Sequence, residues 1–147
     1  VWAENTSKGA RRAKFNEAIA TLERCADIDA ADPSGHYKLA MFYWDKAYRD
    51  PLISDKEKNE FADKGIVAID KSLATKPDYW EAIITKGLLY RVKAQVAPNM
   101  AERRRYLDQA VLLQKQAMDL RKEAQAAASA GATAEIPPEA AAAAEGN

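Results

Sequence analysis

The chain has 147 residues, of which 48% are hydrophobic and 30% charged, a balance that is typical of one soluble globular domain and excludes a disordered chain. Lys and Arg together number 22, and so do Asp and Glu, so the overall charge does not favour nucleic acid or an anionic membrane as a partner. The single cysteine excludes an internal disulfide, and the single histidine excludes a site built from several imidazoles. We therefore expect neither a metal site nor a cofactor.

The pattern of apolar residues predicts an all-α chain of five helices, because no segment alternates like a strand. After an entry segment over residues 1–7, a first helix is expected over 8–29 and a second over 37–48, with Asp32-Pro33-Ser34-Gly35 as the break between them. Further helices are expected over 54–75, 77–94 and 99–123. Their starts have the spacing of N-terminal caps, in the pairs Ser54 and Glu57, Asp78 and Glu81, and Asn99 and Glu102.

The two ends of the chain differ from its middle. The start, Val1-Trp2-Ala3, has the small-x-small pattern of a signal-peptidase site and favours an exported, periplasmic protein over a cytoplasmic one. No run of about 18 apolar residues is present, so we expect no membrane-spanning helix. Residues 128–147 are rich in alanine and carry three acidic residues but no basic one. We therefore expect a folded domain over 1–127 and an acidic tail that cannot bury enough apolar surface to order itself.

The chain repeats itself with a period of 47 residues. At this shift Ala40 and Tyr43 fall on Gly87 and Tyr90, and similar residues match over two helices and the connection between them. A shift of 45 residues extends the match to the fifth helix. Repetition at such a period predicts stacked helical hairpins, each burying its apolar face against its neighbours. Glycine in a helix interior costs about 1 kcal/mol against alanine, so Gly87 indicates a place where another backbone comes close.

Over residues 12–122 these repeats resemble the tetratricopeptide repeat family, in a long-loop, bacterial-type variant. The family pattern is W-x₂-L-G-x₂-Y in the first helix and A-x₃-F in the second. The first helix here reads His36, Leu39, Ala40, Tyr43 and then Ile83, Lys86, Gly87, Tyr90; the second has Ala18 with Leu22, Gly65 with Ile69, and Ala110 with Gln114. The period of 47 is longer than the family's, the tryptophan is replaced, and Gln114 stands where an aromatic belongs. HEAT-type repeats have a period near this length, but the small-x₂-Tyr pairing argues against them.

The resemblance implies a short α-solenoid. Its packing residues would be Leu39, Ala40, Tyr43, Gly87, Tyr90, Ala18, Gly65 and Ala110. The first helix of each pair would line a concave groove for a peptide or helix of a partner, with Tyr37, Met41, Trp44, Ile84, Leu88 and Arg91 pointing into it. Aromatic residues and arginine dominate binding hot spots. We therefore expect a non-catalytic scaffold or adaptor within a complex of different proteins. The alternative is an accessory subunit that docks by its convex side onto a larger membrane-bound or filamentous complex.

Three other features are candidates for sites of chemistry. His36 takes the position of a large packing residue and has no nearby acid or cysteine, so a structural role is expected. Cys25 falls where a small residue is needed, which predicts a buried thiol. The run Arg103-Arg104-Arg105 has Glu102 and Asp108 close by and is typical of a solvated helix face. No phosphate-binding loop or nucleophile motif is present, so we expect no enzyme.

Overall fold

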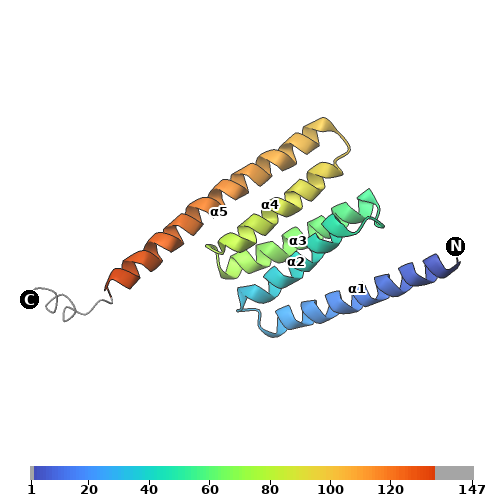
Figure 1. Cartoon of the computed structure of the whole chain (residues 1–147), viewed down its shortest axis with the longest axis horizontal. Coiled ribbons are helices and arrows are strands. Elements are labelled where there is room, and N and C mark those ends of the chain that lie inside the picture. Colours follow the sequence, from blue (N-terminus) through green and yellow to red (C-terminus); the bar gives the residue numbers. More distant parts are fainter. Residues whose placement is uncertain (1, 135–147) are drawn as a thin grey trace, which may run out of the picture.

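The computed structural model describes residues 2–134, with side chains described for residues 7–132, and this part of the chain contains five helices and no strand (Figure 1). The helices are α1 (Trp2–Ile28), α2 (Pro33–Arg49), α3 (Asp55–Thr75), α4 (Trp80–Gln95) and α5 (Met100–Ala134). The predicted all-α fold is confirmed. None of these helices is both long enough and apolar enough to cross a membrane.

Each helix packs against the next one along the chain, and α4 also contacts α2. Helices α2 and α3 form a first hairpin, and α4 and α5 form a second. Helix α1 packs on α2 at one end of the stack, and α5 forms the other end (Figure 1). The architecture is therefore a short, solenoid-like stack in which the first hairpin has a helical neighbour on each side, whereas the second has one on a single side.

Two of the three predicted helix caps are present. The Ser54 hydroxyl accepts a hydrogen bond from the Glu57 backbone, and the Glu57 carboxylate accepts one from the Ser54 backbone at 2.9 Å, which completes a capping box. At the start of α5, Asn99 Oδ1 accepts a hydrogen bond from the backbone of Glu102 at 2.9 Å.

The predicted cap of α4 by Asp78 and Glu81 is wrong. Helix α4 begins at Trp80, and Tyr79 is its N-cap without any side-chain hydrogen bond to the helix. The Tyr79 backbone instead closes a turn onto the carbonyl of Lys76 at 3.2 Å, while its ring lies 5.0 Å from that of Tyr37 on α2. A tertiary contact, in place of a local cap, therefore accompanies the start of this helix.

The first and last helices are longer than predicted. Helix α1 already begins at Trp2, inside the predicted entry segment, and α5 continues beyond Glu123 to Ala134. Alanine has the highest intrinsic helix propensity, so the Ala-rich sequence extends α5 although its side chains over 121–132 are exposed. The predicted boundary between residues 127 and 128 lies within α5, and residues 135–147 of the predicted tail lie outside the described residues.

Two glycines lie where helices approach closely. A Cβ atom added to Gly87 would lie 3.4 Å from the backbone oxygen of Ala110 on α5, so a second backbone lies next to this glycine as predicted but leaves room for a Cβ atom. A Cβ atom added to Gly65 would come within 2.8 Å of the Leu89 side chain and 3.4 Å of Cβ of Tyr43. Gly65 thus lies at the junction of α2, α3 and α4.

The predicted packing residues lie in or beside this core. Those that are buried are Leu39, Ala40, Tyr43, Gly65, Gly87 and Ala110. Tyr90 is half-buried, with its ring 6.1 Å from that of Tyr106, and Ala18 is also half-buried. Ile69, Ile83 and Leu89 are among the largest fully buried side chains, so the core is concentrated where α2, α3 and α4 meet.

The prediction of a buried thiol is wrong, because Cys25 is exposed. Its counterpart in the first hairpin, Ser72, is fully buried, and the Ser72 hydroxyl donates a hydrogen bond to the Pro33 carbonyl of α2 at 2.8 Å. Helix α3 has α2 as its hairpin partner, whereas within the described residues α1 has no such partner on the face that carries Cys25. The neighbouring Ala26 is buried instead, packed against Gly35 of α2.

Candidate interaction surfaces

The predicted groove residues of α2 are half-buried and contact other aromatic or polar side chains. The Tyr37 ring lies against that of Tyr79, which precedes α4. The Sδ atom of Met41 lies 3.4 Å from the hydroxyl of Thr85 in α4. Trp44 stacks on the ring of Tyr48 one turn further along α2, at a centroid distance of 5.4 Å and an interplanar angle of 8°. Tyr37 and Met41 therefore form part of the contact between the two hairpins.

The predicted groove residues of α4 line a crevice between α4 and α5 of about 320 Å³. Ile84, Leu88 and Arg91 form one wall of this crevice with Gly87, and Ala110, Gln114 and Met118 form the other. The Arg91 guanidinium donates a hydrogen bond to Gln114 Oε1 at 2.9 Å, while Met118 is 50% exposed. We call this surface the α4/α5 crevice.

The repeat relates the two groups of residues. At the 47-residue shift Tyr37 falls on Ile84 and Met41 falls on Leu88. Tyr37 and Met41 contact the segment that begins α4, but no helix in the described part of the chain packs on Ile84 and Leu88 from the corresponding side. The α4/α5 crevice is thus an uncovered copy of a surface that is covered in the first hairpin.

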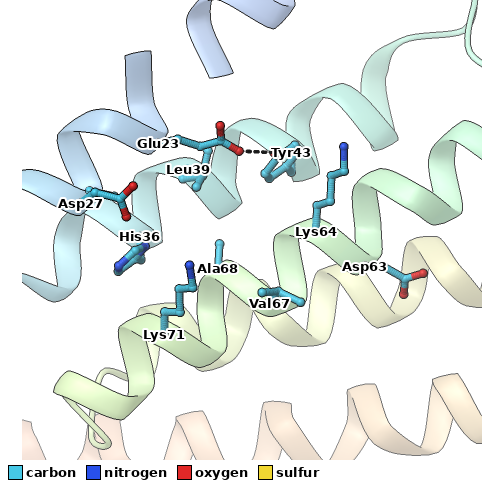
Figure 2. A pocket seen from close by; sticks show the side chains of 11 residues that line it. Glu23, Asp27, His36, Leu39, Tyr43, Asp63, Lys64, Val67, Ala68 and Lys71 are labelled. Carbon is cyan, nitrogen blue, oxygen red and sulfur yellow. Dashed lines mark hydrogen bonds between the residues drawn. The ribbon is translucent and has the colours of Figure 1, made fainter. Parts of the chain in front are cut away.

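A second hollow, of about 410 Å³, lies between α1 and α3, with α2 as its floor (Figure 2). The α1 wall carries the carboxylates of Glu23 and Asp27, and the α3 wall carries the ammonium groups of Lys64 and Lys71. No ion pair joins these four groups across the hollow among the described residues. We call it the α1/α3 cleft.

His36 and Tyr43 contribute the polar groups of the cleft floor. His36, for which a structural role was expected, is buried with 6% of its surface exposed, and its Nδ1 atom has no hydrogen-bond partner among the described residues. The Tyr43 hydroxyl donates a hydrogen bond to the Glu23 carboxylate at 3.3 Å and so links α2 to α1 (Figure 2). Burial, reinforced by the negative charge of Glu23, raises the pKa of Tyr43 to about 12, so this hydroxyl is a donor at neutral pH.

One end of the cleft is held by aromatic packing. Phe15 of α1 stacks on Phe42 of α2 at 5.1 Å and meets Phe61 of α3 edge-on at 5.3 Å. Close by, the Arg12 guanidinium lies 3.4 Å from the Glu57 carboxylate. The contacts of α1 with α3 therefore lie near the start of α3, and further along the acidic groups of α1 and the basic groups of α3 line the cleft without an ion pair between them.

The α1/α3 cleft was not among the sites predicted from the sequence. In the sequence its charged residues are typical of solvent-exposed helix faces. Glu23 and Asp27 have the spacing of surface residues on one helix, and so do Lys64 and Lys71. The one signal in the sequence was that α1 carries two acidic residues and α3, one repeat further along the chain, carries two basic ones. No cluster of three or more residues suited to hold a metal ion occurs among the described residues.

Comparison of the chain with protein-family models, with curated proteins and with solved structures gave no match.

Proposed function

We propose that the chain is a non-catalytic protein-interaction module of the tetratricopeptide type that holds a helix of a partner protein in the α4/α5 crevice. The observation that carries this proposal is the internal correspondence between the two hairpins. The surface of the first hairpin that takes up α4 has a counterpart on the second hairpin, and that counterpart is uncovered in the described residues.

The correspondence extends to individual positions of α3 and α5. Ala62 and Ile69 of α3 have no exposed surface and belong to the core cluster that includes Leu89 of α4. At the 45-residue shift these positions become Leu107 and Gln114, and Leu107 is 42% exposed. Burying such apolar surface contributes roughly 25 cal/mol per Å², so a helix placed over it gains binding free energy. Helix-in-groove docking is a common mode of peptide recognition.

Helix α4 itself indicates which helix would fit. Where α4 packs on the first hairpin, Lys86 of α4 pairs with Asp70 of α3 at 2.6 Å, and Lys93 of α4 pairs with Asp63 of α3. At the 45-residue shift, Asp70 is replaced by Lys115 while Asp63 is matched by Asp108. A ligand helix resembling α4 would therefore need an acidic residue in place of Lys86.

Fluorescence anisotropy with a labelled peptide of residues 78–96 that carries Lys86→Glu tests the proposal. We expect saturable binding to the wild-type chain and its loss in the Leu88→Asp variant, because a carboxylate would face the apolar wall of the crevice. The matched control is Val67→Asp, since Val67 is 57% exposed and lies on α3 away from the crevice. Equal binding of the peptide to wild type and Leu88→Asp, with both folded by circular dichroism, would contradict the proposal.

A further inference from the structure

The outer side of α5 carries a stripe of exposed residues with an unusual charge order. The inner side of the helix, marked by Ala110 and Ala117, is buried against α4. The opposite side of α5 carries six residues at spacings of four, three, one, three and four, namely Arg104, Asp108, Val111, Leu112, Lys115 and Asp119. These spacings place the six side chains on one helical face. We call this face the α5 stripe.

All six side chains of the α5 stripe are exposed, and Val111 and Leu112 are each 61% exposed. Arg104 and Asp108, and likewise Lys115 and Asp119, are four residues apart and have the spacing of ion pairs within one helix. Nevertheless no ion pair of these four charged groups is formed within the described part of the chain. The stripe therefore presents two adjacent apolar side chains between charged groups that have no charged partner there.

The order of charges along the stripe is self-complementary when one copy is reversed. Along the chain the order is basic, acidic, apolar, apolar, basic, acidic. An antiparallel second copy, centred between Val111 and Leu112, brings Arg104 opposite Asp119 and Asp108 opposite Lys115. Each of these pairings then occurs twice, as two-fold symmetry requires of an isologous interface. A parallel second copy in register would instead place Asp108 against Asp108.

We propose that a second copy of this chain docks antiparallel on the α5 stripe and forms a two-fold symmetric dimer centred between Val111 and Leu112. Burial of these two side chains from each copy supplies the apolar contact. The four interchain ion pairs fix the orientation and the register, which is the main contribution of charged groups at an interface. Antiparallel helices of this kind cross at about 20°, so the contact follows α5 over the whole stripe.

The α5 stripe shares Asp108 and Lys115 with the surface on which the proposed ligand helix would lie, but it contains none of the residues that line the α4/α5 crevice. The α4/α5 crevice is lined by Gln114 and Met118, which lie between the stripe and the buried side of α5. A crevice residue such as Leu88 can therefore be substituted without changing the stripe. The Leu88→Asp variant is expected to remain dimeric, whereas the stripe variants are expected to lose the dimer.

Two charge reversals test the dimer by sedimentation velocity over a series of concentrations. We expect the wild-type chain to dimerise, and Asp108→Lys and Lys115→Asp each to self-associate about 10-fold or more weakly, because either change brings like charges together twice. An equimolar mixture of the two variants should restore the dimer. In the mixed dimer, the lysine introduced at position 108 of one chain faces the aspartate introduced at position 115 of the other. The unchanged Lys115 of the Asp108→Lys chain faces the unchanged Asp108 of the Lys115→Asp chain. Native mass spectrometry would identify this dimer as the mixed species.

The control is Arg49→Asp, an exposed charge reversal on α2, which does not contact α5. It should dimerise like the wild type. The proposal is overturned if the wild-type chain stays monomeric at the highest concentration. It is equally overturned if the mixed variants, each folded by circular dichroism, stay monomeric, or if Leu88→Asp abolishes the dimer while Asp108→Lys does not.

Discussion

The two hairpins are built from corresponding residues, but they have different surroundings. The α2/α3 hairpin lies between α1 and α4, whereas the α4/α5 hairpin has a helical neighbour only on the α3 side among the described residues. As a consequence, Ile69 of α3 is fully buried while its counterpart on α5, Gln114, is exposed. In a stacked repeat, therefore, a position becomes part of the core through its neighbours, because a single hairpin cannot bury both of its faces.

The largest expected difference in stability between the hairpins is at Ile69 of α3 and its counterpart on α5, Gln114. Ile69→Ala leaves a cavity in the contact of α2, α3 and α4, so we expect a loss of about 2–5 kcal/mol in the free energy of unfolding. Gln114→Ala should change it by no more than about 0.5 kcal/mol, as is usual for exposed positions. Urea denaturation of the two variants measures both values. Equal losses would mean that the second hairpin is also covered on that side.

A pH effect is expected from the first hairpin. The pKa of Tyr43 is raised from 10.0 to about 12, chiefly by burial, so the folded chain favours the neutral phenol. The associated stability, on the order of 1–3 kcal/mol, is fully present below about pH 10 and is lost as the pH rises through about 12. Thermal melts between pH 9 and 12 should show a steeper loss for wild type than for Tyr43→Phe. Parallel pH profiles of the two proteins would contradict this assignment.

A smaller effect on stability is expected at the N-terminal ends of α3 and α4, because only α3 has a side-chain cap. Ser54→Ala removes the hydroxyl that accepts the Glu57 backbone hydrogen bond in the capping box of α3, so we expect a loss of about 1 kcal/mol in the free energy of unfolding. Asp78→Ala before α4 removes no cap and should change that energy by less than about 0.5 kcal/mol. Guanidinium chloride unfolding can resolve the two, and a larger loss for Asp78→Ala would show that we have misassigned the cap.

The smallest expected effect is a gain in stability, from the substitution Gly87→Ala. The Cβ atom of Gly87→Ala meets the Ala110 oxygen at 3.4 Å, which is an ordinary contact, so the higher helix propensity of alanine should stabilise the chain by about 0.5–1 kcal/mol. In the first hairpin, Gly65→Ala places its Cβ atom 2.8 Å from the Leu89 side chain and should gain less or lose stability. Differential scanning calorimetry compares the two melting temperatures, and the opposite order would refute the difference in packing.

The five helices and their pairing could be predicted from the sequence. Helix periodicity, the capping residues around Ser54 and Asn99, and the 47-residue repeat depend on local spacing, so the all-α fold could be predicted without a structure. The approach of a second backbone to Gly87 was predicted because glycine is costly in a helix interior, although a Cβ atom would also fit there in ordinary contact.

Which of the repeated positions are buried, and which surfaces remain open, depends on how the helices stack in the folded chain. Cys25 was predicted to be buried because it falls where a small residue is needed, but it is exposed because no hairpin partner covers that face of α1 in the described residues. The α1/α3 cleft and the uncovered α4/α5 crevice likewise arise from the order in which helices stack. Burial requires a second surface, and the sequence of one helix does not specify whether that surface is present.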